Sequence, residues 1–176
     1  MTNTCYNALD VHIDKGKGKN TALIYDSPIT GNKNKFTYEE LRLKVSKFAG
    51  ALQDQGVTKG DRVIIYMPMI PEAVIAMLAG ARMGVIHSVG FGGFASNELA
   101  SRSDDSKEKI LVTAYCGFEP GRTVEYKPLV DDAVKQAKHK IDKMILFQRP
   151  GHEVKLNDPK EISWEEVVYN ENEIKC

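Results

Sequence analysis

Residues 61–89 have the sequence DRVIIYMPMIPEAVIAMLAGARMGVIHSV, and this stretch decides the fold. Its first part, residues 61–67, is almost continuously apolar, which is the pattern of a parallel strand covered on both faces. Pro71 and Glu72 occupy first-turn positions that favour the start of a helix, and Gly84 suits its end. The apolar residues that follow form a second strand. The order strand, helix, strand predicts one βαβ unit of a parallel sheet.

The same alternation continues after this unit. The patterns predict, in order, a short helix capped by Ser96 that ends near Ser101, a strand over residues 110–114, a helix begun by Pro128 and a strand over residues 144–147. Short connections and right-handed crossovers join such elements into a mainly parallel sheet flanked by helices, so the predicted fold class is α/β. We expect an α/β domain over residues 1–150 and a polar tail over residues 151–176, in which Ser163 caps a final helical turn.

The amino-terminal part of the sequence predicts a short helix, a hairpin and a long helix. Residues 7–13 have amphipathic spacing, with Asp10 pointing away from the buried face. Strand-forming residues and turn residues follow, and they predict a hairpin that returns to Phe36. Thr37 and Glu40 then have the spacing of a capping box, which marks the start of the long helix.

The composition of the 176 residues, 42% apolar and 27% charged, is that of an ordinary soluble domain. Basic and acidic side chains both number 24, so no net charge attracts nucleic acid or an anionic membrane. The longest apolar stretch, residues 63–69, is far shorter than the ~20 residues that cross a bilayer. Three distant cysteines without a Cys-x-x-Cys motif favour reducing surroundings. No leader pattern is present, and the expected compartment is the cytoplasm or the mitochondrial matrix.

Two glycine-containing loops at predicted strand ends form the candidate binding site, because ligands of open parallel sheets lie at the carboxyl ends of strands. The first loop is Gly90-Phe91-Gly92-Gly93-Phe94. It runs into the helix that begins near Ser96, where free N–H groups and the helix dipole attract an anion. The two phenylalanine rings can stack on a heterocycle. The alternative is a tight turn with both rings in the core.

The second loop, Cys116-Gly117-Phe118-Glu119-Pro120-Gly121-Arg122, follows the strand that ends at Ala114. Arg122 presents a fork of donors that suits a phosphate, and a charge-assisted hydrogen bond of this kind contributes about 1.5–3 kcal/mol. The alternative is a surface arginine paired with Glu119 or Glu125. We expect the two strands to be neighbours, so that both loops converge on one crevice.

The pattern Gly90-x-Gly92-x-x-Ala95 also satisfies the dinucleotide-binding motif, which makes a nicotinamide-dependent enzyme an alternative. Such an enzyme needs an acidic residue at the end of the next strand to bind the ribose. That position is occupied by Tyr115 and Cys116, which weakens the alternative.

Other side chains that could carry chemistry have simpler explanations. The four histidines have no carboxylate or cysteine at ligand spacing, so the sequence predicts neither a metal site nor a catalytic histidine. Methionines are common in apolar interiors. Four of them are therefore expected in or near the core: Met67, Met69, Met77 and Met83.

Several motifs agree in order and spacing with one known family. They cover residues 61–72, 77–88 and 91–96, with residues 20–25 and 36–41 upstream. Together they closely resemble the amino-terminal subdomain of AMP-forming short-chain acyl-CoA synthetases, from about Tyr6 to Trp164. The stretch Glu-Pro-Gly-Arg at residues 119–122 is most similar to the propionyl-CoA synthetase subgroup, because acetyl-CoA synthetases usually have Arg-Gly-Gly-Arg there.

The resemblance implies an adenylate-forming fold and a ligase that joins acetate or propionate to CoA. In that family, ATP with Mg²⁺ converts the acid to an enzyme-bound acyl-adenylate, and the CoA thiol then displaces AMP. The implied CoA-binding residues are Glu119, Pro120, Gly121 and Arg122 at the nucleotide end of CoA, and Phe91, Gly92 and Gly93 beside them. No catalytic residue is assigned.

The family's phosphate loop, which ends in Gly-x-Pro-Lys, does not occur in these 176 residues. The adenine and ribose contacts and the lysine-bearing carboxyl-terminal domain of the family are also missing. We therefore expect this chain to supply one wall of a CoA site and not to stabilise the adenylation transition state by itself. The alternative function is a non-catalytic interaction fragment, which self-associates through an unpaired sheet edge.

Overall fold

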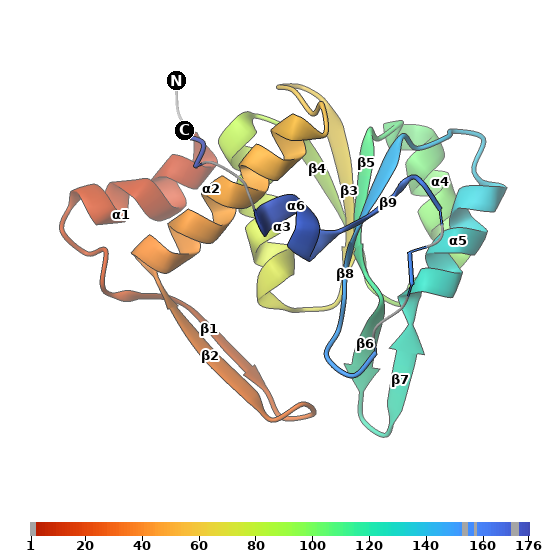
Figure 1. Ribbon diagram of the computed structural model, residues 1–176, viewed down its shortest axis with the longest axis horizontal. Helices are drawn as coiled ribbons and strands as arrows, with labels where there is room; N and C mark the ends of the chain where they lie inside the picture. The colour runs from red at the N-terminus through yellow and green to blue at the C-terminus, as the bar shows by residue number, and fades with distance from the viewer. Residues whose placement is uncertain (1–2, 153–154, 157, 170–172) are drawn as a thin grey trace.

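The computed structural model describes residues 3–152, 155–156, 158–169 and 173–176. Its centre is a parallel sheet of five strands in the order β4-β3-β5-β8-β9 (Figure 1). The strands are β3 (Arg62–Met67), β4 (Ile86–Phe91), β5 (Ile110–Ala114), β8 (Lys143–Phe147) and β9 (Glu161–Ser163). The predicted α/β class is confirmed, and the apolar runs that suggested buried strands form the centre of the sheet.

Helices cover both faces of this sheet (Figure 1). Side chains of a strand alternate between its faces, so consecutive residues of β3 belong to different cores. Ile65 packs in the larger core, and Ile64 packs in the smaller one. The larger core includes helices α2 (Tyr38–Asp54), α3 (Pro71–Met83) and α6 (Trp164–Tyr169), and the smaller core includes α4 (Ser96–Ser106) and α5 (Tyr126–Gln136).

Two antiparallel hairpins extend beyond the carboxyl end of the sheet (Figure 1). One consists of β1 (Thr21–Ser27) and β2 (Asn32–Thr37), as the sequence predicts. The other consists of β6 (Cys116–Glu119) and β7 (Arg122–Glu125), where the sequence predicts only a loop. A π-helical turn (Tyr6–Asp10) and α1 (Val11–Asp14) form the predicted amino-terminal helix.

Two helix caps predicted from the sequence, at Thr37 and Ser96, can be compared with the structure. The capping box of α2 is confirmed, because the Thr37 hydroxyl accepts a hydrogen bond from the Glu40 N–H and the Glu40 carboxylate accepts one from the Thr37 N–H. Ser96, in contrast, does not cap α4. Its hydroxyl donates to the Asp132 carboxylate of α5, and Ala95 occupies the N-cap position. Tertiary contact with α5 therefore replaces the predicted local cap, and α4 continues to Ser106.

Two elements beyond residue 150 belong to the fold, although the sequence suggests a tail there. Strand β9 extends the sheet next to β8, and the Trp164 ring stacks on Phe48 with centroids 3.8 Å apart. Ser163 precedes α6 as predicted, but its hydroxyl donates to Glu165. A domain boundary at residue 150 stays a prediction.

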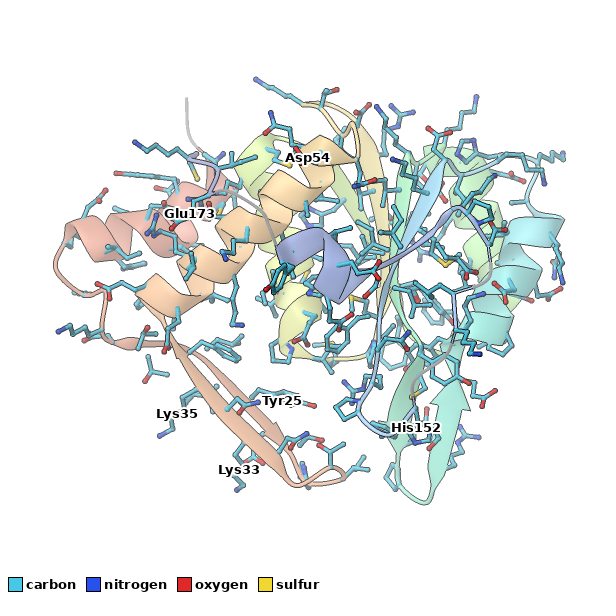
Figure 2. The ribbon with its side chains drawn as sticks, in the orientation of Figure 1. Tyr25, Lys33, Lys35, Asp54, His152 and Glu173 are labelled. Atoms are coloured by element: carbon cyan, nitrogen blue, oxygen red, sulfur yellow. The ribbon has the colours of Figure 1, made fainter. Side chains whose placement is uncertain are left out.

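The hairpin β1-β2 has two different sides. In Figure 2, Tyr25 extends toward the body of the molecule, whereas Lys33 and Lys35 point away from it.

Among the residues that the structure describes, no helix is long and apolar enough to cross a lipid bilayer.

Candidate functional site

The first glycine loop connects β4 to α4 and is held by Tyr66. The Tyr66 side chain is fully buried, and its hydroxyl donates to the Phe94 carbonyl at 2.7 Å and accepts from the Gly93 N–H at 3.0 Å. Burial is the main cause of the raised pKa of Tyr66, so this hydroxyl stays neutral and can donate. Since the Gly93 N–H is already bonded, it is not one of the free donors that the sequence suggested for an anion.

Position 92 requires glycine because the Tyr126 side chain fills the space beside it. A Cβ atom on Gly92 would lie 2.6 Å from Cε2 of Tyr126, and one on Gly117 would lie 2.1 Å from the Tyr126 hydroxyl. Tyr126 is only 4% exposed, and its ring lies at an edge angle to Tyr66. The two glycines therefore let the first loop and the second hairpin approach the same tyrosine. The sequence analysis missed this role of Tyr126.

Phe91 and Phe94 do not pack in the core. They are 61% and 40% exposed, and their ring centroids are 5.9 Å apart. The core alternative for this loop is therefore wrong. Because both rings are exposed, they are accessible to a ligand, and their stacking on a heterocycle stays a prediction.

The second predicted loop consists of strand β6 and the turn of the β6-β7 hairpin. Glu119 and Arg122 face each other across a two-residue turn of Pro120 and Gly121, and the turn uses the positive φ of 76° at Gly121. The Arg122 side chain is 71% exposed, and its guanidinium lies 2.6 Å from the Glu119 carboxylate. The predicted pairing of these two residues is thus present. Arg122 is also accessible to a ligand, because exposed ion pairs of this kind are weak.

The expectation that the two loops follow neighbouring strands is wrong. Strand β3 lies between β4 and β5, so the loops do not follow neighbouring strands. Both strands nevertheless end at the same edge of the sheet, and Tyr126 at the start of α5 contacts both Gly92 and Gly117. The first loop and the base of the second hairpin are therefore joined through a side chain of α5.

Two basic side chains that the sequence analysis did not select lie against the second hairpin. The Arg149 guanidinium lies 4.8 Å from the centroid of the Phe118 ring, and the His152 ring lies 5.2 Å from it (Figure 2 labels His152). Both residues follow β8, and the chain turn after that strand brings them to β6. No pattern in the sequence connects residues this far apart.

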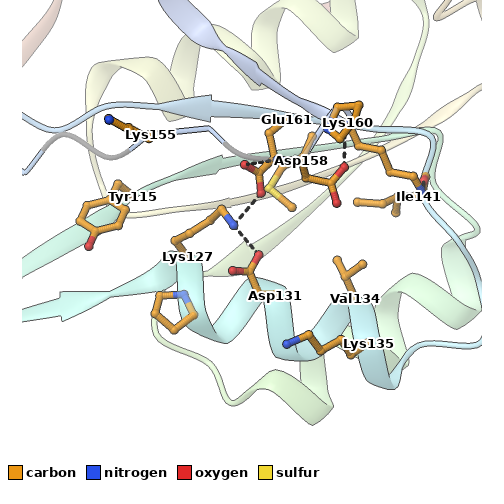
Figure 3. A pocket seen from close by; sticks show the side chains of 13 residues that line it. Tyr115, Lys127, Asp131, Val134, Lys135, Ile141, Lys155, Asp158, Lys160 and Glu161 are labelled. Atoms are coloured by element: carbon orange, nitrogen blue, oxygen red, sulfur yellow. Dashed lines mark hydrogen bonds and ion pairs between the residues drawn. The ribbon is translucent and has the colours of Figure 1, made fainter.

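A separate pocket of about 680 Å³ lies between α5 and the segment that leads into β9 (Figure 3). The Lys127 ammonium forms ion pairs there with Asp131 and with Glu161 at 2.6 Å. Burial opposes the charge of Lys127, but these two carboxylates outweigh it and raise its pKa. Lys127 therefore joins α5 to β9, and its charge is already balanced within the protein.

The amino-terminal helix carries a buried ion pair. Asp10 does not point away from the protein as predicted: its two carboxylate oxygens accept hydrogen bonds from Arg82 at 2.8 and 2.9 Å. The Arg82 guanidinium also donates to the Cys5 sulfur at 3.0 Å. The possible ligand atoms of Cys5, Asp10 and Cys176 lie within 4.8 Å of one another. The positively charged Arg82 guanidinium already lies beside Cys5 and Asp10, which argues against a metal ion there.

Comparison with known proteins decides the family. The model of a family described as "AMP-binding enzyme" matches residues 11–174. The chain belongs to this AMP-binding enzyme family. Human "Acyl-CoA synthetase short-chain family member 3, mitochondrial" is 52% identical over 177 residues, which cover 100% of this chain and 26% of the relative. The "Acetyl-coenzyme A synthetase" of Streptomyces avermitilis is 42% identical over 166 residues, which cover 94% of this chain and 25% of the relative.

A solved structure agrees with this family. "Acetoacetyl-CoA Synthetase from Streptomyces lividans" superposes with a TM-score of 0.83 at 25% identity and covers 97% of this chain and 25% of that one. The predicted resemblance to short-chain acyl-CoA synthetases is confirmed, and membership of the AMP-binding enzyme family displaces the nicotinamide alternative. The chain spans about a quarter of the length of the relatives it matches.

Proposed function

We propose that this chain is the amino-terminal part of an AMP-forming ligase for acetate or propionate, and that it supplies one wall of the CoA site. The observation that carries the proposal is the exposed Arg122 guanidinium, which stands on a hairpin at the same end of the sheet as the exposed Phe91 ring. A guanidinium fork suits the 3′-phosphate of CoA, and an aromatic ring suits its adenine.

The complete ligase would work in two steps. ATP with Mg²⁺ activates the carboxylate as an acyl-adenylate and releases pyrophosphate, and the CoA thiol then displaces AMP. The phosphate loop for the first step does not occur in this chain. In this proposal, the chain's own residues therefore act in the second step, where they orient the nucleotide end of CoA.

Propionate is the preferred acid in this proposal, supported by the resemblance of Glu119 and Pro120 to the propionyl-CoA synthetase subgroup. The mitochondrial matrix is the proposed compartment, because the printed name of the human short-chain family member 3 describes it as mitochondrial. A pyrophosphate-release assay that compares propionate with acetate, on the protein encoded by the complete reading frame, tests the first point, and fluorescent tagging of the same protein tests the second.

Calorimetry with two matched ligands tests the CoA site. CoA should bind the chain weakly, and Arg122→Ala should lower its affinity by about tenfold, the value of one charge-assisted hydrogen bond. Dephospho-CoA lacks the 3′-phosphate, so its affinity should be the same for both proteins. Lys33→Ala, which removes an exposed cation of the other hairpin, serves as the control and should change neither affinity. Equal binding of CoA by the wild type and Arg122→Ala would remove Arg122 from the site.

A further inference from the structure

Two of the three cysteines are far apart in the sequence but lie together in the structure. The sulfur atoms of Cys5 and Cys176 lie within 4.8 Å of each other. Both are free thiols, and Cys5 is fully buried whereas Cys176 is exposed. Figure 1 shows the carboxyl end of the chain beside the amino-terminal helix, on the opposite side of the molecule from the β6-β7 hairpin. The candidate CoA site therefore uses neither thiol.

One buried guanidinium holds both of the segments that carry these cysteines. Nη1 of Arg82 donates a hydrogen bond to the Cys5 sulfur at 3.0 Å, and Nε of the same side chain donates to the Ile174 carbonyl at 2.7 Å. The Ser46 hydroxyl of α2 donates to that carbonyl as well, also at 2.7 Å. Because the two segments share this buried partner, the fold itself keeps the two thiols close to each other.

Further contacts hold the segment around Cys176 in place. The Ile174 side chain packs against the larger core, and the Glu173 carboxylate lies 3.3 Å from the Arg42 guanidinium. An S–S bond is about 2.0 Å long, so the two sulfur atoms need to approach each other by less than about 3 Å. Rotation of the exposed Cys176 side chain between staggered conformations moves its sulfur by about this distance.

We propose that Cys5 and Cys176 are a modification site, at which a small disulfide such as oxidised glutathione closes an intramolecular disulfide bond. The exposed Cys176 thiolate attacks one sulfur of the small disulfide and releases one small thiolate. The Cys5 thiolate then attacks the Cys176 sulfur of this mixed disulfide and releases the second small thiolate. The two protein thiols thus lose two electrons and two protons, and the small disulfide gains both and becomes two thiols.

The surroundings of Cys5 determine how fast the second step proceeds. Burial raises the pKa of the Cys5 thiol, and the charge and hydrogen bond of Arg82 offset only part of that rise. The other groups that face this thiol are the Asp10 carboxylate, which also raises its pKa, and the Cys176 thiol. Only the thiolate attacks a disulfide, so we expect the bond to close slowly at neutral pH and faster as the pH rises.

Mapping of the thiols in the folded chain tests the proposal. The chain is incubated with oxidised glutathione at mildly alkaline pH, free thiols are blocked by alkylation, and the unfolded protein is then cleaved after glutamate, which releases residues 174–176 as one peptide. This peptide should be linked to the one that contains Cys5, and two of the three thiols should be lost.

Two variants serve as controls for the mapping. Cys176→Ser changes an exposed side chain and should keep the Cys5 thiol free, whereas Cys116→Ala removes the third cysteine and should leave the link unchanged. A chain that carries glutathione on Cys176 without a link to Cys5 would contradict the proposal. A link from either cysteine to Cys116 would contradict it as well.

The melting temperature provides a second measurement, which needs no substitution. A bond between residues 5 and 176 closes a loop of nearly the whole chain, and a long closed loop restricts the unfolded state strongly. The oxidised chain should therefore melt at least about 5 °C above the reduced chain. By the same linkage, glutathione should reduce the bond about a hundredfold more readily, at equilibrium, in the urea-unfolded chain than in the folded chain. An oxidised chain that melts at the same or a lower temperature would overturn the proposal. Neither measurement involves CoA, so both are independent of the Arg122 test.

Discussion

Gly92 lies directly against the ring of Tyr126, at a distance that leaves no room for a methyl group. This contact connects the loop after β4 to the first residue of α5, across the strand that separates β4 from β5. The two candidate CoA-binding segments are thus positioned by a buried side chain between them, and the stability of that contact determines how rigidly they are held.

Gly92→Ala should therefore lower the free energy of unfolding by about 1–3 kcal/mol, the usual cost of overpacking. Gly80→Ala is a suitable control, because its Cβ would meet the nearest atom, Nδ1 of His87, at an ordinary 3.5 Å. Alanine is also favoured over glycine in a helix, so Gly80→Ala should be neutral or stabilising. Urea denaturation measures both values, and an equal loss in both variants would refute the packing explanation.

Tyr66→Phe should loosen the first glycine loop. The substitution removes two hydrogen bonds from a fully buried hydroxyl, which costs about 1–3 kcal/mol. Hydrogen–deuterium exchange should speed up at the Gly93 N–H, which loses its acceptor. Tyr126→Phe is the control, because no hydrogen bond of the Tyr126 hydroxyl occurs among the described residues. If exchange at Gly93 does not change in Tyr66→Phe, the tyrosine does not hold this loop.

Glu119→Gln should strengthen CoA binding several-fold. The Glu119 carboxylate forms an ion pair with the Arg122 guanidinium at 2.6 Å. The neutral amide of the glutamine variant would compete less with a phosphate for this guanidinium. The stability of the chain should change by less than about 0.5 kcal/mol, because the pair is exposed. Calorimetry at two salt concentrations checks the result, since the gain should shrink as salt screens the charges. A weaker affinity in Glu119→Gln would mean that Glu119 itself contacts CoA.

The ion pair of Asp10 and Arg82 predicts that Asp10→Asn strongly destabilises the chain and that the size of this effect depends on pH. Breaking such a pair by Asp10→Asn should cost about 3–5 kcal/mol, because the Arg82 charge stays buried. Burial opposes the ionisation of Asp10, but the hydrogen bonds and charge of Arg82 outweigh it, so its pKa lies below the ordinary 3.8. The contribution of ionised Asp10 is therefore complete above pH 3.8 and is lost as pH falls through the lower folded-state pKa.

Chemical denaturation of wild type and Asp10→Asn between pH 2 and 7 checks whether the contribution of Asp10 to stability is lost in acid. The difference in stability should be constant near neutral pH and should decrease in acid. A difference that persists unchanged at pH 2 would show that Asp10 does not titrate as described. The conservative variant Asp10→Glu, which keeps the charge, should recover part of the loss.

The sequence predicted the fold best where burial and local signals agree. The apolar run of β3, the proline start and glycine end of α3, and the capping box at Thr37 all lie where expected. It failed where a distant residue competes for a side chain. Ser96 bonds Asp132 instead of its own helix, and Asp10 bonds Arg82 instead of water. Both partners are tens of residues away, so no local pattern could show them.

The candidate site divides in the same way. Residue types alone identified Arg122 and the glycine loop, because a guanidinium and a glycine-rich turn at strand ends suit a nucleotide. Sequence could not show that β3 separates the two strands, that Tyr126 fills the space between them, or that Arg149 lies over Phe118.

What the sequence determined by itself is the family and the order of the strands and helices other than β6, β7 and β9, since apolar periodicity, caps and motif spacing are local properties of the chain. What only the tertiary structure decided is the order of strands within the sheet, the tyrosine that joins the two loops and the apolar cavity between β1, α3 and β4. These features depend on contacts between residues far apart in the chain, and the packing of whole elements selects such contacts.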